Sequence, residues 1–174
     1  MSVAILLVAI VPALLMAAAF FDLTTYTIPN LLPGALIVLF PVFMLALAVG
    51  GHPMSWNDFS LHVFAGFIGL LLGLGMFSVG WVGGGDAKLF AAALLWLGWD
   101  ALYDYVILAL LLGGALTIAL IMLRRMPLPS LLAQQPWLLR LADRNAGVPY
   151  GVALAAAALH VLPDTEVFRL AAVS

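Results

Sequence analysis

Two carboxyl side chains stand out because each lies where a long apolar segment meets a polar break. Asp22 follows the apolar run 3–21, and Asp86 lies between the glycines 83–85 and another apolar run. Two carboxyls that share a site cannot both ionise easily, so one keeps a proton while the other can deprotonate a water molecule. Such a pair can hydrolyse an amide without a metal, a thiol or an activated serine.

The helix ends suggest a division of roles between these two acids. Asp86 begins an expected helix, where the positive end of the helix dipole favours its anion, whereas Asp22 ends one, where the negative end favours its neutral form. We therefore expect Asp86 to be the resting base and Asp22 to hold the proton. The other six acids lie in loops or at water-facing helix ends, where solvation explains them.

The composition is that of an integral membrane protein. Of the 174 residues, 66% are hydrophobic and only 8% are charged, against about 45–50% and about 25% in soluble domains. Six Lys and Arg and a net charge of −2 do not favour a nucleic-acid partner. The chain has no cysteine, and His52, His62 and His160 do not form a metal-binding pattern, so we expect neither a metal nor a cofactor.

Apolar runs of about 20 residues, the length that crosses a bilayer core, predict an all-α bundle. They lie at 3–21, 31–49, 61–81, 102–123 and 148–162, and a sixth at 87–98 is short. We expect a single domain over residues 1–174 with about six transmembrane helices. The first run lacks a basic start and is expected to be a retained helix rather than a signal peptide.

Basic residues predict the orientation. Arg124, Arg125, Arg140 and Arg144 cluster in one connection, which the positive-inside tendency assigns to the cytoplasm. Counting crossings back from there assigns the breaks that contain Asp22 and Asp86 to the same face, with both termini outside. Within this connection we expect an amphipathic segment that lies along the lipid headgroups. Its apolar residues are Leu131, Leu132, Trp137, Leu138 and Leu141.

The short fourth run makes Asp86 unusual. Twelve residues cover only about 18 Å of a core of about 30 Å. If the outer end of this helix reaches the interface, Asp86 is submerged below the headgroups, where an acid is a functional candidate. The alternative is that the bilayer thins locally and Asp86 simply caps the helix.

The glycines also allow two interpretations. Gly83, Gly84 and Gly85 leave the backbone unobstructed, so an extended peptide could pair beside them as an added strand; they could equally form a plain turn. Gly69 and Gly73 make a GxxxG pattern, which favours close helix packing.

Three segments together resemble a known family. They read DLTTYTIPN from Asp22, GGGDAK from Gly83 and VPYG from Val148. In this order, and near expected cytoplasmic helix ends, they resemble the type IV prepilin peptidases, which are GxGD-type intramembrane aspartic proteases. The resemblance covers nearly the whole chain.

The resemblance implies a specific activity. Asp22 and Asp86 would be the catalytic aspartates of an enzyme of the inner (cytoplasmic) membrane. It would cut the leader of prepilins or pseudopilins at the cytoplasmic face, just before the hydrophobic helix of the substrate. Members that also N-methylate the product use an added domain with cysteine-bound zinc, so this chain resembles the short, protease-only forms. Such forms often serve Tad/Flp-type pili, although archaeal preflagellin peptidases are short as well. Many members carry basic residues between the first aspartate and IPN, where this chain has Thr24, Thr25, Tyr26 and Thr27.

The remaining site-shaping candidates keep more than one role. Pro29 and Asn30 suit the opening of the second helix. Pro149 and Tyr150 could start the last helix in the same way, or Tyr150 could line the cleft. Lys88 could bind lipid phosphate, pair with Asp86 or touch the substrate.

Two other function classes compete with a peptidase. In a small proton-coupled transporter, the two aspartates would relay protons across the membrane. In a non-catalytic subunit of a secretion or pilus assembly machine, both aspartates would tolerate replacement by Asn.

Overall fold

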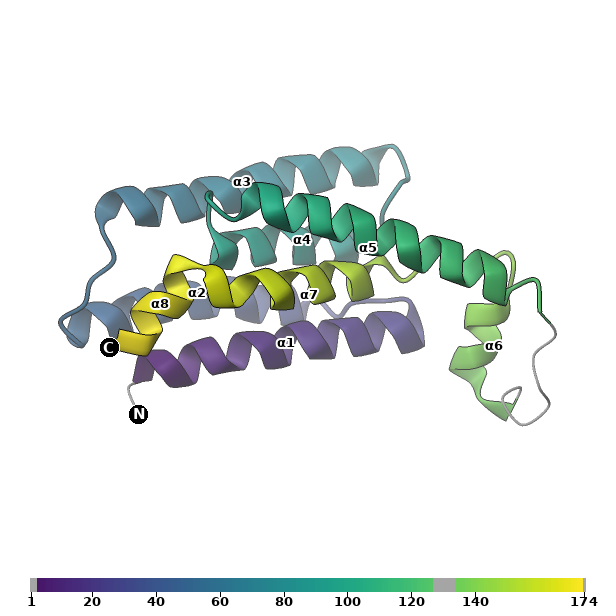
Figure 1. Cartoon of the computed structure of the whole chain (residues 1–174), viewed down its shortest axis with the longest axis horizontal. Helices are drawn as coiled ribbons and strands as arrows, with labels where there is room; N and C mark the ends of the chain where they lie inside the picture. Colours follow the sequence, from purple (N-terminus) through teal and green to yellow (C-terminus); the bar gives the residue numbers. More distant parts are fainter. Residues whose placement is uncertain (1–2, 127–133, 174) are drawn as a thin grey trace.

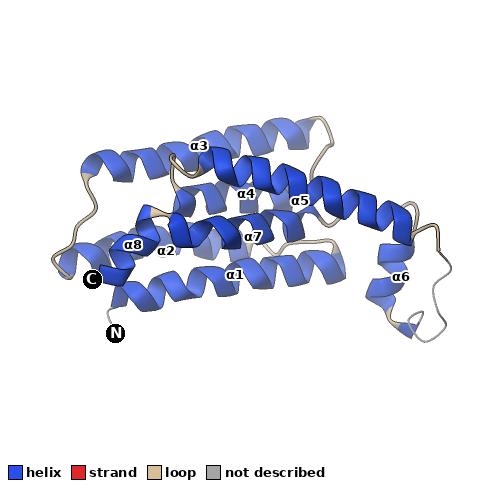
Figure 2. Ribbon diagram, in the orientation of Figure 1, coloured by secondary structure: helices blue, strands red, loops and turns tan. Residues whose placement is uncertain are grey.

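In the computed structural model, which describes residues 3–126 and 134–173, every regular element is helical (Figure 2). The elements are α1 (Val3–Thr25), α2 (Leu31–Val49), α3 (Trp56–Ser78), α4 (Gly84–Leu97), α5 (Leu102–Leu123), α6 (Pro136–Ala142), α7 (Tyr150–Val161), a 3₁₀ turn (Leu162–Asp164) and α8 (Glu166–Val173). The all-α prediction is confirmed for the described residues.

Within the described residues, four helices are long and apolar enough to cross a membrane: α1, α2, α3 and α5. A fifth crossing results if α7, the 3₁₀ turn and α8, which bend by 50°, count as one span. With 14 residues, α4 is about 21 Å long, too short to cross alone. The structure therefore supports a multi-pass membrane protein with four or five apolar spans, and the expected number of six is not confirmed.

Most helix boundaries agree with the apolar runs, and the differences have local causes. The third helix begins at Trp56, earlier than expected, because the Ser55 hydroxyl caps it by accepting a hydrogen bond from the Asp58 amide at 3.1 Å. The helix in the last run, α7, ends at Val161, and the chain continues through a 3₁₀ turn into α8, which contains Arg169. Of the expected amphipathic stretch, Trp137, Leu138 and Leu141 lie in α6, whereas Leu131 and Leu132 lie outside the described residues.

The short helix α4 is enclosed by the longer ones. It lies beside α3 and also contacts α2 and α7, while α1 packs against α2 and α7 (Figure 1). The indole of Trp96 in α4 is buried between Phe40 and Phe43 of α2. Its Nε1 donates to the Leu36 carbonyl at 2.8 Å. A short helix with most of its apolar side chains buried thus forms the centre of the bundle.

Small residues on α3 allow α4 to approach closely, as the GxxxG pattern predicts. A Cβ on Gly69 would lie 2.7 Å from Leu94 Cδ1, and one on Gly73 would lie 3.0 Å from the Ala87 backbone. Gly73 is five residues before Ser78, the end of α3, a distance of about 7.5 Å along the helix. The start of α4, including Asp86, is therefore set back inside the bundle.

We expect Gly73→Val to separate α3 from α4. The added side chain meets backbone atoms of Ala87 rather than a movable side chain, and such overpacking costs about 1–3 kcal/mol. The thermal unfolding midpoint in detergent should fall by several degrees. Gly75→Val is the matched control, because no atom lies within 4 Å of a Cβ there; an equal loss in both variants would contradict this packing role.

Candidate active site

Asp22 lies in the last turn of α1 and is almost completely buried, with 4% of its surface exposed. Its Oδ2 accepts a hydrogen bond from the backbone amide of Gly151 at 2.6 Å. Gly151 is the second residue of α7, so this carboxyl faces the N-terminus of a different helix. The contact joins parts of the chain that the sequence pattern could not connect.

Asp86 is the third residue of α4, and its two oxygens have different surroundings. Oδ2 accepts from the Gly83 amide at 3.1 Å and so caps the helix. Oδ1 is buried and has no hydrogen-bond partner in the structure. Buried polar atoms without partners are rare and call for an explanation. Capping therefore accounts for one carboxylate oxygen only, and the other is left for another role.

The fold brings the two carboxyls together. Asp22 and Asp86 are close enough for direct electrostatic interaction, and the Gly151 amide lies near both. The end of α1 and the starts of α4 and α7 all lie at the same end of the bundle (Figure 1). Two acids this close to one another are an arrangement in which one proton can be held between the carboxyls.

The N-terminus of α7 adds a contact at Asp22 that the helix-end argument did not include, so the assignment of the proton to this acid stays a prediction. The expectation that Asp22 holds the proton considered only the C-terminal end of α1. In the structure, Asp22 also accepts an amide hydrogen bond from α7, and such a bond favours a carboxylate anion. Because both carboxyls face a helix N-terminus, titration belongs to the pair.

Glycines make room for the contacts around the pair. A Cβ on Gly85 would lie 3.1 Å from Ile28 Cβ, and one on Gly151 would lie 2.6 Å from Ile28 Cδ1. Ile28, which the sequence analysis did not single out, therefore packs against the glycines beside both acids. Gly84 and Gly85 form the first turn of α4, and only Gly83 is extended. The three glycines are thus a helix start and not the continuous edge that strand pairing would need.

Lys88 and Asn30 connect α4 to the start of α2. Lys88 Nζ donates to Asn30 Oδ1 at 2.8 Å, so this lysine is bonded to the IPN segment instead of to Asp86. Pro29 precedes α2, and its carbonyl accepts from the Leu32 amide at 3.0 Å. These residues fix the segment that carries Ile28 against the start of α4.

Tyr150 fulfils both of its expected roles, while Pro149 forms the N-cap of α7. The Tyr150 ring packs on Gly113 of α5, where a Cβ would lie only 2.5 Å from the ring. The same residue begins α7 and lines a cavity that also contains Asp86. Its position is therefore adjacent to the acid pair.

Positive charge reaches the segment after Asp22 from another part of the chain. Arg140 donates to the Thr25 carbonyl at 3.3 Å, and Arg124 donates to the carbonyls of Leu141 and Gly147. The Arg124 guanidinium also lies near the buried Tyr26 hydroxyl. Burial raises the pKa of this phenol, although Arg124 acts in the opposite direction. Arginines from the connection between α5 and α7 thus adjoin the segment whose own residues are uncharged.

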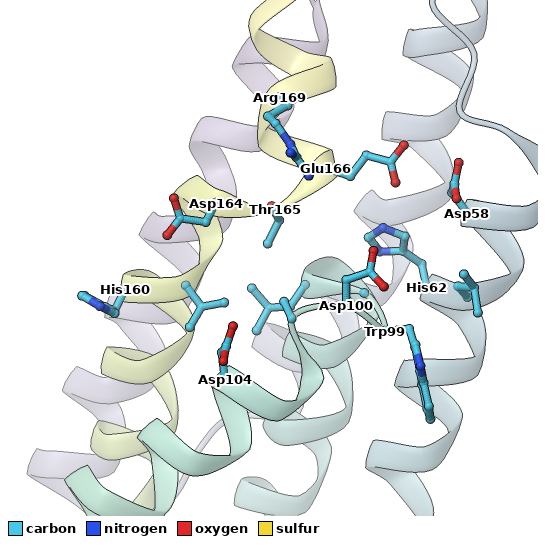
Figure 3. Close-up of a pocket in the computed structure, with 15 residues that line it drawn as sticks. Asp58, His62, Trp99, Asp100, Asp104, His160, Asp164, Thr165, Glu166 and Arg169 are labelled. Atoms are coloured by element: carbon cyan, nitrogen blue, oxygen red, sulfur yellow. The ribbon is translucent and has the colours of Figure 1, made fainter.

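A second cavity, of about 270 Å³, lies at the other end of α4 and gathers acids that the sequence analysis treated as separate (Figure 3). Its acidic lining comes from three parts of the chain: Asp58, Asp100, Asp104, Asp164 and Glu166. Arg169, His160 and the buried His62 share the lining. No three His, Asp or Glu side chains are grouped to hold a metal ion anywhere in the described residues.

The fold and the site define a polytopic membrane protein that gathers two carboxyls and a helix N-terminus at one end of its bundle. The model of the type IV leader peptidase family matches residues 9–118, which include both Asp22 and Asp86. The chain belongs to this family, which confirms the resemblance that its three segments indicated.

A named relative agrees with this assignment. Over 128 residues the chain is 33% identical to a prepilin leader peptidase/N-methyltransferase of Pectobacterium carotovorum subsp. carotovorum. The alignment covers 71% of the chain but only 44% of the relative. The chain thus matches less than half of the relative's length. No solved structure matches it.

Proposed function

We propose that this protein is a prepilin leader peptidase in which Asp22 and Asp86 form the catalytic pair. The observation that carries the proposal is the approach of two carboxyls from α1 and α4: the buried Asp22, which accepts from the Gly151 amide at 2.6 Å, is close enough to Asp86 for direct electrostatic interaction. Membership of the type IV leader peptidase family supports peptide cleavage as the reaction class. Neither the transporter nor the assembly-subunit alternative has a specific observation in its favour.

The proposed reaction needs the two carboxyls in different protonation states. The ionised carboxyl takes a proton from a water molecule, whose oxygen attacks the carbonyl carbon of the leader peptide bond. The protonated carboxyl gives its proton to the carbonyl oxygen, so a neutral tetrahedral intermediate forms. Collapse of this intermediate breaks the C–N bond: the carboxyl that gained the proton from water gives it to the departing amine, and the other carboxylate takes a proton back from a hydroxyl of the intermediate. The pair then returns to its starting state.

The surrounding residues would hold this geometry without taking part in the bond changes. The Gly151 amide fixes Asp22 Oδ2, and the Gly83 amide fixes Asp86 Oδ2. The unpartnered Asp86 Oδ1 is then the atom available to a water or to the substrate carbonyl. Pre-set hydrogen bonds of this kind keep reacting groups within the narrow range that catalysis needs.

The proposal extends to location and substrate class. Arg124, Arg140 and Arg144 lie at the end of the bundle that holds the acid pair, and the positive-inside tendency favours the cytoplasm for this end. We therefore propose cleavage at the cytoplasmic face of the inner membrane, with the N-terminus outside. Residues 1–174 would act as one membrane domain on prepilins or pseudopilins, including those of the Flp type.

Cleavage of the leader bond is the activity to test. The purified protein in liposomes should release the leader from a prepilin substrate, and mass spectrometry should find a new N-terminus without a methyl group. A transporter predicts charge movement across the liposome membrane and no peptide product. If the substrate stays intact at high enzyme concentration while the protein remains folded, the proposal fails.

We expect a bell-shaped dependence of kcat/KM on pH. Acid protonates the carboxylate that activates water, and alkali removes the proton that the partner must donate, so activity falls on both sides of an optimum. The two limbs describe the pair and not either residue alone. Rates measured in liposomes across acidic and neutral pH would check this expectation, and a flat profile would contradict the shared-proton mechanism.

A further inference from the structure

An apolar groove of about 240 Å³ lies beside Asp86, among α3, α4, α5 and α7. We define the apolar groove by six of its lining residues, which are Leu72, Gly73, Asp86, Phe90, Leu110 and Tyr150. Among the described residues that line it, Asp86 is the only acid and Tyr150 the only residue with a hydroxyl group. The surface of the groove is apolar throughout, so the groove is unsuited to a polar ligand.

The groove is open toward the lipid side of the bundle. Leu72 on α3 and Leu110 on α5 line it and are 49% and 57% exposed. At this point α3 packs mainly on α4, and α5 packs mainly on α7, so the two helices border the groove from opposite sides. An apolar segment within the membrane could reach Asp86 by moving sideways between α3 and α5.

The inner wall of the groove suits a helix in particular. Gly73 and Ala87 lie where α3 meets α4, and Ala109 is the corresponding small residue of α5. Small residues allow a further helix to approach closely in a membrane. Asp86 belongs to the same lining, so a helix seated here would end next to a residue of the acid pair.

We propose that the apolar groove binds the hydrophobic helix of the substrate that begins just after the cleaved bond. This inference rests on the proposed function, because a leader peptidase must present that bond to the acid pair. The helix enters from the lipid between α3 and α5, and its first turns pack against Leu72 and Leu110. A membrane lipid chain is the competing occupant, and the experiment below separates the two.

Site-specific disulfide cross-linking tests the groove directly, because the chain has no cysteine of its own. Leu72→Cys and Leu110→Cys are each introduced into an Asp86→Asn background, which is expected to hold uncleaved substrate. Single cysteines are placed in turn along the first two turns of the hydrophobic helix of a prepilin. Leu71→Cys and Leu111→Cys are the matched controls, since these neighbouring leucines are 49% and 64% exposed and lie outside the groove lining.

We expect cross-links from positions 72 and 110, and at least tenfold less product from positions 71 and 111. Disulfides form only when the Cβ atoms come within about 3.5–4.5 Å, so this contrast reports seating in the groove. Equal cross-linking at all four positions would overturn the inference, as would absence of cross-links at 72 and 110, the result that lipid occupancy predicts.

The test keeps this inference separate from the proposed function. The parent protein is assayed for cleavage, and the thermal unfolding midpoint of each cysteine variant in detergent shows whether that variant is folded. Cleavage without the expected cross-links would contradict the proposed helix-binding groove but not the proposed peptidase activity. If the substrate helix cross-links in the groove but the parent protein does not cleave the substrate, the proposed peptidase activity is contradicted. The cross-linking pattern would then still support the groove as a helix-binding site.

Discussion

Asp22→Asn and Asp86→Asn are each expected to lower the rate of leader cleavage by at least about 10²–10⁴-fold, the range for loss of a general acid or base. Each variant retains the size and the hydrogen-bond acceptor of the side chain, so the contacts with Gly151 and Gly83 can persist. What is lost is the ability to exchange a proton with water or with the substrate carbonyl. Rates should be compared at equal amounts of membrane-inserted protein.

The matched control for these variants is Asp104→Asn. Asp104 is exposed, lies in the first turn of α5 and lines the cavity at the opposite end of the bundle. We expect this variant to cleave at a rate within about twofold of the original, because surface substitutions cost little stability. Near-normal processing by either Asp22→Asn or Asp86→Asn would exclude the pair as the catalytic group.

Gly151→Ala is expected to reduce the cleavage rate by about 10²-fold, the size of effect that a displacement of about 1 Å can have on catalysis. The new Cβ would lie 2.8 Å from Asp22 Oδ2 and 2.6 Å from Ile28 Cδ1. The carboxyl, the isoleucine or the start of α7 must therefore move. Kinetics with purified protein should show the loss mainly in kcat, because the reacting groups are misplaced while the apolar groove is retained.

Gly147→Ala serves as the control for Gly151→Ala. It lies in the segment that leads into α7, and a Cβ there meets no atom within 4 Å. Its carbonyl, which accepts from Arg124, is unchanged by the substitution. We expect normal cleavage from Gly147→Ala. If Gly151→Ala were equally active, the close contact between α7 and Asp22 would have no role in catalysis.

The helices could be predicted from the sequence where apolar length alone decides them. α2 and α5 have the bounds that their apolar runs indicated. The run that ends in α7 was harder, because its continuation through a 3₁₀ turn into α8 depends on contacts of Val167 and Ala171 with the core. A linear hydropathy pattern contains no information on such a bend.

The two acids of the candidate active site could be predicted from the sequence, but the residues that surround them could not. Asp22 and Asp86 were identifiable because a carboxyl beside an apolar segment is costly. Ile28 and the Gly151 amide act only through tertiary contacts, and an isoleucine or a glycine in a membrane protein carries no signal of its own. The assignment of the proton to Asp22 stays a prediction, because it used the dipole of α1 and could not include the N-terminus of α7.

The basic residues near Thr25 illustrate the same limit. The segment from Thr24 to Thr27 has no basic residue of its own, yet Arg140, which is 115 residues from Thr25 in sequence, donates a hydrogen bond to the Thr25 carbonyl. A positive charge that other family members carry within this segment can thus come from a distant part of the chain that folds against it. A motif departure of this kind does not by itself argue against the site.

The measurement that tests the central claim most directly is a double-substitution cycle on Asp22 and Asp86. Cleavage of one purified prepilin is measured for the original protein, for each Asn variant and for the variant with both substitutions. If the carboxyls act as one unit, each single variant should be about as defective as the double variant, as is found for catalytic groups that function together. Losses that multiply in the double variant, or a single variant that still cleaves efficiently, would contradict the account.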